Sequence, residues 1–386
     1  MMPRRSWEDE ELVLLRDNAR RFFERECVPH ELRWRAQHHA ERELWNKAGA
    51  AGILCASIPE EYGGGGGHFL HEAVICEEQW YALSYAFSNN VHSGIVAHYL
   101  LAYGSQAQKQ RWLPGMATGE IVTAIAMTEP GAGTDLQRIR THARREGDEY
   151  VVNGSKIFIT NGLHADLVCV AVKTDVNAGA KGVSLLMVET AGLKGFRRGQ
   201  PLDKIGQKMN DTTELFFDEV RVPVENLLGG PEGEGQGFRQ LMQQLPRERL
   251  IIAVGSVALM RRAIDETLAH VRERQIFGQA LMKQQNTRFV LAECETQARV
   301  AQAYVDDCIA RLQADTLDVP TAAMAKWWTT DTACRVVDAC VQLFGGYGYM
   351  TEYPIARLYT DVRVGRIYGG ANEVMKEIIA RSLEQG

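Results

Sequence analysis

The sequence of 386 residues lacks several features that would each point to a particular kind of protein. It has no run of about eighteen or more apolar residues, so we predict no membrane span. Its eight cysteines form no CxxC pair and no cluster with histidine at metal-ligand spacing, so we expect reduced core cysteines and no bound metal. The net charge is −6 and Lys and Arg are dispersed, which argues against a nucleic-acid surface.

The first residues also lack the pattern of a targeting segment. Residues 1–23 pass directly into an amphipathic helical pattern, without the apolar stretch of a secretory signal. The acidic residues at positions 8–11 are atypical of a mitochondrial presequence, which is poor in acid. We therefore expect a cytoplasmic protein.

The spacing of apolar residues changes twice along the chain. Helical spacing over residues 7–118 gives way to alternation, and helical spacing returns after a linker at 229–237. We expect strands over 121–127, 149–152, 156–160, 167–172, 183–188 and 214–222, with Asn153 and Gly154 as a hairpin turn. Further helices are expected over 246–278, 283–313, 320–344 and from residue 371. This order predicts an α+β fold with an N-terminal helical domain (1–121), a middle β-sheet or barrel domain (122–232) and a C-terminal four-helix-bundle domain (233–386).

The helix expected over 246–278 is the longest, and it carries a carboxylate near its start. Glu248 lies between Arg247 and Arg249 with apolar residues on both sides. Such a residue is usually a solvated charge that complements the helix dipole. The alternative is a carboxylate in an apolar pocket, where desolvation raises its pKa into the range useful for accepting a proton. The local sequence leaves both interpretations open.

Several glycine-rich motifs also have an ordinary structural interpretation when each is taken alone. The loop at 126–136 carries two glycines and two threonines, but it lacks the third glycine of a dinucleotide-binding fingerprint. The segments at 342–354 and 366–381 read as a helix end and a helix start. Together, however, they resemble the acyl-CoA dehydrogenase family. The similar segments, in order, are TEPGAG (128–133), ITNG (159–162), LPxERL (245–250), RxxFG (274–278), QLFGGYGY (342–349) and YGGxNExMKExIAR (368–381).

The resemblance covers nearly the whole chain and is greatest to the long-chain members of the family. It implies an FAD cofactor between the middle and C-terminal domains. The residues implied to line one subunit's flavin are Ile125, Ala126, Met127, Thr128, Gly133, Thr134, Phe158, Ile159 and Thr160. Those implied to reach the FAD of a neighbouring subunit, in a homotetramer built as a dimer of dimers, are Arg274, Gln285, Gln342, Leu343, Phe344, Gly345 and Gly346. Ala371, Asn372 and Glu373 would contact the adenosine-diphosphate part.

The reaction implied by the resemblance is α,β-dehydrogenation of a fatty acyl-CoA, of medium or long chain or branched, to the trans-2-enoyl-CoA. A base removes the α-proton while a hydride passes to flavin N5, and electron-transferring flavoprotein accepts the electrons. Short- and medium-chain members place the base directly after a tyrosine that corresponds to Tyr368, where this chain has Gly369. Long-chain members place it at the position of Glu248, which is therefore the expected base.

The resemblance also assigns a set of substrate contacts. Arg249 would pair with the phosphates of CoA, as a guanidinium suits. The remaining substrate contacts would be Thr134, Arg239, Tyr368, Gly369 and Gly370. Arg239 stands where close relatives commonly have an aromatic residue. Two other functions are compatible with the same motifs: an acyl-CoA oxidase, and a catalytically silent flavin- or CoA-binding relative.

Overall fold

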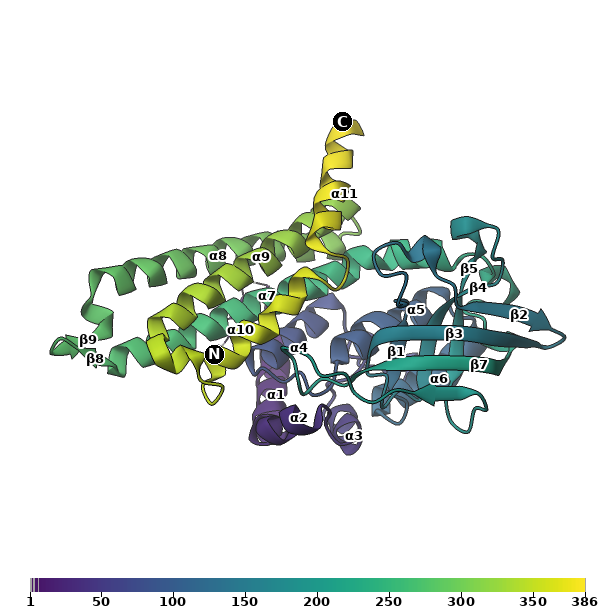
Figure 1. Ribbon diagram of the computed structural model, residues 1–386, viewed down its shortest axis with the longest axis horizontal. Helices are drawn as coiled ribbons and strands as arrows, with labels where there is room; N and C mark the ends of the chain where they lie inside the picture. Colours follow the sequence, from purple (N-terminus) through teal and green to yellow (C-terminus); the bar gives the residue numbers. More distant parts are fainter. Residues whose placement is uncertain (1, 3, 6, 386) are drawn as a thin grey trace.

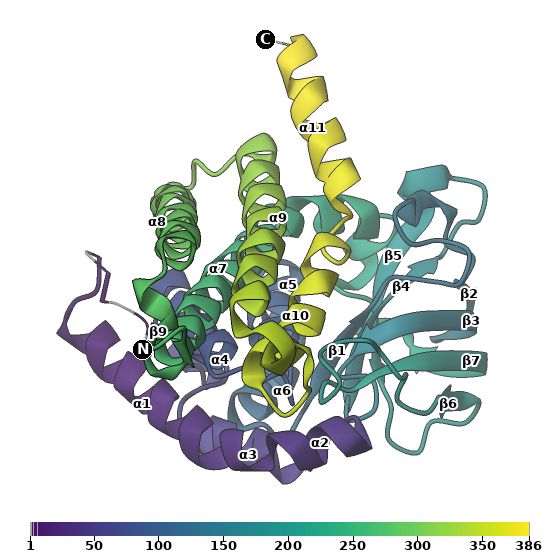
Figure 2. The same ribbon diagram turned by 60° about the vertical axis from the view of Figure 1, so that its left-hand side comes forward.

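The computed structural model describes residues 2, 4, 5 and 7–385 and has helices, then a sheet, then helices (Figures 1 and 2). This arrangement confirms the predicted fold class. The predicted boundary at 121/122 falls between α6 and β1, and that at 232/233 falls within the short 3-10 helix Gly230–Gly233 before α7; both stay predictions. The N-terminal helices are α1 (Glu10–Glu26), α2 (Glu31–Gln37), α3 (Glu43–Ala50), α4 (Phe69–Tyr81), the π-helical turn η3 (Asn90–Val96), α5 (Ala97–Tyr103) and α6 (Gln106–Thr118).

The middle region is a mixed sheet in which β4 pairs in parallel with β1 and β2. Its strands in the described chain are β1 (Thr123–Ala126), β2 (His142–Glu146), β3 (Glu149–Thr160), β4 (Leu167–Lys173), β5 (Val183–Glu189), β6 (Phe196–Arg198) and β7 (Thr212–Pro223). The order is β1-β4-β2-β3-β7-β6, and β5 pairs with β4. Every residue of β4 is buried, as expected for a strand covered on both faces.

The predicted hairpin turn at Asn153 and Gly154 is wrong. β3 runs through both residues, and its register with β7 shifts there, so the pair forms a bulge within one long strand. The Asn153 side chain bonds to Glu219 across the strands, and Gly154 has a φ of +145° close to Thr141. The hairpin turns one pairing earlier, between β2 and β3, where Gly147 has a φ of +62°.

The C-terminal region is built around one helix, α7 (Gly237–Glu273). It packs against α4, α8 (Gln285–Gln313) and α9 (Val319–Phe344), so its apolar residues are shared by the N-terminal and C-terminal helices. The chain continues through a short hairpin, β8 (Gln275–Ile276) and β9 (Gln279–Ala280), and later through α10 (Pro354–Asp361) and α11 (Asn372–Gln385). In both ribbon views α11 projects away from the body of the molecule.

The sequence-based start of this helix at residue 246 is also wrong. α7 begins at Gly237, and Pro246 lies inside it. A proline within a helix removes one backbone hydrogen bond, and here the helix continues because its residues on both sides of Pro246 are packed against other elements. Glu248 is therefore a mid-helix residue. Among the described residues, no helix has the length and apolarity needed to cross a membrane.

Candidate active site

Glu248 is a buried carboxylate on the inner face of α7. It is 5% exposed, and its Oε1 accepts a hydrogen bond of 2.9 Å from the hydroxyl of Tyr99 on α5. Burial raises the pKa of Glu248 to about 7, against the opposing effects of the Tyr99 hydroxyl and of Arg249. The interpretation as a solvated surface charge is therefore wrong. A carboxylate with this pKa can accept a proton near neutral pH.

The neighbouring arginine, Arg247, is held away from Glu248 by a second buried carboxylate. Its Nη2 donates to Glu72 Oε2 of α4 at 2.7 Å and lies 2.8 Å from His98 Nε2 of α5. Although burial opposes ionisation of Glu72, the charges of Arg247 and His98 lower its pKa to about 2. The two buried carboxylates, Glu72 and Glu248, therefore differ greatly in basicity. The difference arises because the Arg247 guanidinium is bonded to Glu72 and not to Glu248.

The turn before α11 lies over the same stretch of α7. Arg249 Nε donates to the carbonyl of Gly369 at 3.4 Å, and a Cβ at Gly369 would meet Cδ1 of Ile252 at 2.4 Å. Gly369 and Gly370 have φ values of +64° and +94°, which side chains rarely tolerate. The structure therefore brings together Glu248, Arg249 and the predicted substrate residues at 368–370.

A buried lysine binds the backbone of the turn at Gly369 and Gly370. Lys326 of α9 is 0% exposed, and its Nζ donates to the carbonyl of Gly370 at 2.7 Å and to Asn372 Oδ1 at 2.8 Å. The Asn372 amide in turn donates to Asp331 Oδ1 at 2.8 Å and to Thr330 Oγ1 at 3.0 Å. Burial lowers the pKa of Lys326 to about 7. Asn372, expected to contact the cofactor, thus has its amide group inside a protein network.

The predicted flavin-binding residues of the sheet meet at one edge. Residues 125–134 continue β1 into a loop, and the amide of Ile157 on β3 donates to the carbonyl of Thr128 at 2.9 Å. Ile125 pairs in register with Cys169 of β4, and the charge of Glu248 contributes to the raised pKa of that thiol after burial. This edge of the sheet and Glu248 therefore face each other.

A buried ion pair shapes the loop. Lys156 Nζ donates to Glu129 Oε1 at 2.8 Å and to the Met127 carbonyl at 3.0 Å, while the amides of Arg140 and Thr141 donate to the Glu129 carboxylate. Lys156 is fully buried, and burial lowers its pKa to about 8. The pair fixes the position of the backbone on which Thr128 and Gly133 lie.

The surface of this edge fits a flat, polar-edged ring system. Phe158 is 63% exposed and has a φ of +61° at a bulge of β3, so its aromatic face is presented to the outside of the strand. The hydroxyls of Thr128, Thr134 and Thr160 have no hydrogen-bond partner among the described residues. A Cβ added at Gly131 would meet nothing within 4 Å. An exposed aromatic ring and unbonded hydroxyls on the neighbouring segments 125–134 and 158–160 are suitable for contact with a flavin.

Another predicted group lies far from Glu248. Arg274 follows the end of α7, about 39 Å from Glu248 at the usual helical rise. Gln285 begins α8, and residues 342–346 span the end of α9 and the start of the 3-10 helix Gly345–Tyr349, at the same end of the bundle, opposite the sheet (Figure 1). Arg274 lies over the ring of Tyr347 at 5.6 Å. One chain therefore does not bring these residues to its own Glu248.

The remaining predicted residues are spread between these groups. Ala371 and Glu373 flank Asn372 at the start of α11, and Glu373 is exposed. Arg239 is exposed on α7, about 13 Å before Glu248 along the helix axis. The structure does not place Arg239 beside Glu248, and its substrate role stays a prediction. Seven of the eight cysteines are buried, which confirms their expected place in the core.

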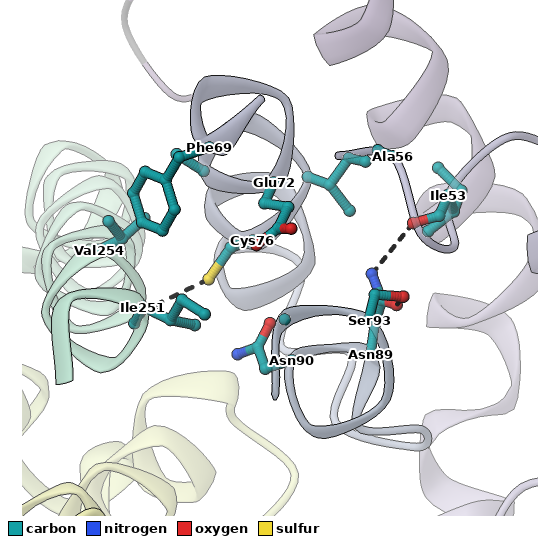
Figure 3. Close-up of a pocket in the computed structure, with 13 residues that line it drawn as sticks. Ile53, Ala56, Phe69, Glu72, Cys76, Asn89, Asn90, Ser93, Ile251 and Val254 are labelled. Atoms are coloured by element: carbon teal, nitrogen blue, oxygen red, sulfur yellow. Dashed lines mark hydrogen bonds between the residues drawn. The ribbon is translucent and has the colours of Figure 1, made fainter. Parts of the chain in front are cut away.

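A narrow cavity lies one turn beyond Glu248 (Figure 3). It has a volume of about 10 Å³, roughly the room that one water needs. Its walls come from α4, η3 and α7, with Phe69, Ile251 and Val254 on the apolar side and Glu72 and Asn90 on the polar side. A Cβ at Gly94 would come within 2.8 Å of Ile251 Cδ1. Glycine at position 94 therefore leaves the room that Ile251 occupies.

Sequence reasoning missed three of the groups that shape this site. Tyr99 carries no local signal, because its contact joins residues 149 positions apart. Lys326 could have been noticed as a lone charge in an apolar helical stretch, AMAKWW. Lys156 and Glu129 lie within two segments, 156–162 and 128–133, that were identified as flavin-binding motifs. Their opposite charges were the one sequence feature that could have indicated an ion pair.

Three family models match the chain in succession. They are the N-terminal domain (residues 9–120), the middle domain (124–220) and the C-terminal domain (235–384) of acyl-CoA dehydrogenase. Together they match most of the described chain.

Curated relatives include dehydrogenases of different acyl-CoA classes. The mitochondrial long-chain specific acyl-CoA dehydrogenase of Mus musculus is 45% identical over 96% of this chain and 86% of its own length. The short-chain specific acyl-CoA dehydrogenase of Clostridium acetobutylicum is 36% identical over 96% and 97%. The mitochondrial isovaleryl-CoA dehydrogenase of Oryza sativa is 33% identical over 95% and 90%.

Solved structures of the same fold agree. An acyl-CoA dehydrogenase from Geobacillus kaustophilus has a TM-score of 0.95 and 44% identity, covering 98% of this chain and 99% of that one. A glutaryl-CoA dehydrogenase from Mycobacterium smegmatis, solved in complex with FADH2, has a TM-score of 0.91 and 25% identity, covering 98% and 96%. The three family models and the relatives that match nearly end to end give one conclusion: the chain belongs to the acyl-CoA dehydrogenase family.

Proposed function

We propose that the protein oxidises a fatty acyl-CoA of medium or long chain, or a branched one, to the trans-2-enoyl-CoA, with Glu248 as the acceptor of the α-proton. The observation that carries this proposal is the state of Glu248: buried, hydrogen-bonded through one oxygen, and with a pKa near neutrality. A base works best when its pKa lies near the working pH. The proposal extends the family assignment to a particular residue and substrate class.

FAD is the cofactor of this enzyme family. When bound, it supplies the hydride acceptor at N5 and, through a ribityl hydroxyl, one donor to the thioester carbonyl. On this chain, residues 125–134 and 158–160 would hold the flavin, with Phe158 against the ring and the threonine hydroxyls at its edge. The buried pair of Lys156 and Glu129 supports that surface from inside the sheet.

The α-proton of a thioester is weakly acidic, so the chain must also stabilise negative charge at the carbonyl. The Gly369 backbone N–H is the proposed protein donor, and glycine keeps the backbone there free of a side chain. Lys326 and Arg249 bind the carbonyls of Gly370 and Gly369, so the turn is fixed before substrate arrives. A donor that is already oriented needs no reorganisation during the reaction.

The cavity of Figure 3 is the proposed start of the acyl pocket. Ile251 and Val254, which line it, lie on α7 about one and two turns after Glu248. At about 10 Å³ it must widen for a long chain, and Ile251 is one of the side chains that line it. The CoA phosphates would pair with Arg249, while Thr134 and the backbone of Gly369 and Gly370 would flank the thioester.

The functional unit is proposed to be a homotetramer, a dimer of dimers. The position of Arg274, Gln285 and residues 342–346 supports this, because they lie at the opposite end of α7 from Glu248 and can serve the FAD of a neighbouring subunit. Electron-transferring flavoprotein is the proposed electron acceptor. The expected cytoplasmic location stays a prediction.

A panel of acyl-CoA esters tests the function directly. Each ester is mixed anaerobically with the FAD-loaded protein, and bleaching of the flavin absorbance is recorded. Rapid bleaching by medium-chain, long-chain or branched esters, followed by slow recovery in air, is expected. Fast recovery in air would instead indicate an oxidase. If no ester bleached the flavin, the catalytic proposal would be wrong and a silent binding protein would remain.

A further inference from the structure

Two consecutive residues of α5 contact two consecutive residues of α7. His98 lies 2.8 Å from Arg247, and Tyr99 donates its hydroxyl to Glu248 at 2.9 Å. The π-helical turn η3 directly precedes α5, and such turns insert a residue that changes which side chains face a neighbouring helix. Tyr99 is completely buried, so its hydroxyl has little alternative to this contact.

We propose that Tyr99 is a positioning residue that keeps Glu248 in its ionised, proton-accepting form and turns its free oxygen toward the substrate. The inference rests on the proposed role of Glu248 as the base. Tyr99 binds Oε1, whereas Oε2 has no hydrogen-bond partner among the described residues. One oxygen is therefore fixed and the other is available for the α-proton.

The charged and titratable groups around Glu248 leave this task to Tyr99. On α7, Arg247 is engaged by Glu72, and Arg249 donates to the Gly369 carbonyl. On β4, Cys169 is a buried thiol whose pKa is raised by burial. On α5, His98 contacts Arg247 and Glu72, and Tyr103 bonds to glutamines of α7. Tyr99 is thus the one hydrogen-bond donor to the Glu248 carboxylate in the described part of the chain.

A neutral donor suits a base better than an ion pair does. Glu72 shows the alternative, since contact with Arg247 lowers its pKa to about 2, where it accepts protons poorly at neutral pH. A phenol stabilises the carboxylate by a smaller amount, which offsets part of the burial without removing basicity. Glu248 therefore stays ionised above neutral pH and remains a base of useful strength.

The test is the pH dependence of flavin reduction in the FAD-loaded Tyr99→Phe variant. The rate of flavin reduction should rise with pH as Glu248 ionises. Because Tyr99→Phe removes the hydrogen bond to the ionised carboxylate, the midpoint of this rise should move up by about one to two pH units. The rate near pH 7 then falls about tenfold, while the plateau at high pH stays close to that of the wild type. Tyr103→Phe, one turn further along α5, is the matched control and should leave the midpoint unchanged.

A second measurement does not depend on catalysis. The infrared band of the protonated Glu248 carboxyl, identified by its absence in Glu248→Gln, is titrated in the substrate-free holoenzyme, and its midpoint should move up in Tyr99→Phe. If that variant does not fold, fluorotyrosine at position 99, with fluorine beside the hydroxyl, keeps the side chain and strengthens the donor. The midpoint should then move down.

Each outcome is informative. An unchanged midpoint in both Tyr99 variants, or a lowered plateau without any movement of the midpoint, would overturn the role of Tyr99. If Glu248→Gln keeps both the rate of flavin reduction and the rise of that rate with pH, the assignment of Glu248 as the base fails. In that case the infrared titration alone decides whether Tyr99 controls the pKa of Glu248. A midpoint that rises with phenylalanine and falls with fluorotyrosine would establish the inference.

Discussion

Replacing Glu248 with glutamine should make the protein more stable at alkaline pH, although it removes the proposed base. The folded-state pKa of Glu248 is raised from 4.5 to about 7 by burial. The folded chain therefore binds this proton more tightly than the unfolded chain, and stability falls as the pH rises from about 4.5 to about 7. Above that range the buried, ionised carboxylate lowers the free energy of unfolding by about 3 kcal/mol. Glutamine, which is neutral and still accepts the Tyr99 hydroxyl, avoids that cost.

The assay compares thermal unfolding temperatures of FAD-saturated wild type and Glu248→Gln at pH 5 and pH 8. With an unfolding entropy of about 2.1 cal/mol/K per residue, 3 kcal/mol corresponds to a gain of about 4 °C at pH 8. At pH 5 the two proteins should differ by about 1 °C or less, because most of Glu248 is then protonated. Glu273→Gln, an exposed position at the end of the same helix, is the control. An equal gain at both pH values, or a less stable variant at pH 8, would refute the reasoning.

Three further substitutions test the groups that support the site. Lys326→Met keeps the buried apolar part of the side chain but leaves the Gly370 carbonyl without its donor, so flavin reduction should slow by about tenfold or more while FAD content is retained. Stopped-flow kinetics measure the rate of reduction and absorbance measures the FAD content. An unchanged rate would contradict the role of the turn. Glu129→Gln weakens the buried ion pair with Lys156 and should lower the affinity for FAD by about tenfold, measured by equilibrium dialysis. An affinity equal to that of the wild type would contradict the proposed support of the flavin surface by this pair. Gly94→Val narrows the cavity and should lower activity with long acyl chains much more than with short ones, measured as kcat/KM across the ester panel; a uniform loss would place the acyl chain elsewhere.

The order of the fold was predictable because it depends on local periodicity. The short apolar runs of β4 and β5 and the helical stripes of α8 and α9 each identify their own element. Two boundaries were not predictable from local rules. Pro246 and the pair Asn153–Gly154 are strong signals for a helix start and a turn, but packing of α7 and pairing with β7 override them.

The sequence supplied candidate residues for the site, but it did not supply their contacts. Glu248 was identified through the family resemblance, since the same carboxylate taken alone reads as a surface charge. Its burial and its bond to Tyr99 join distant parts of the chain, and no local pattern reports such a contact. Lys326 is similar, because its role depends on the turn at Gly370 lying over α9. Side chains that support a site are chosen by tertiary geometry, which leaves little trace in local sequence.

The most direct measurement is anaerobic flavin reduction by a bound acyl-CoA in the Glu248→Gln variant. The protein should retain FAD and bind the ester, while the rate of reduction falls by about 10²–10⁴-fold, the usual contribution of a positioned base. Reduction at a rate close to that of the wild type, with FAD and substrate bound, would contradict the assignment of Glu248 as the proton acceptor.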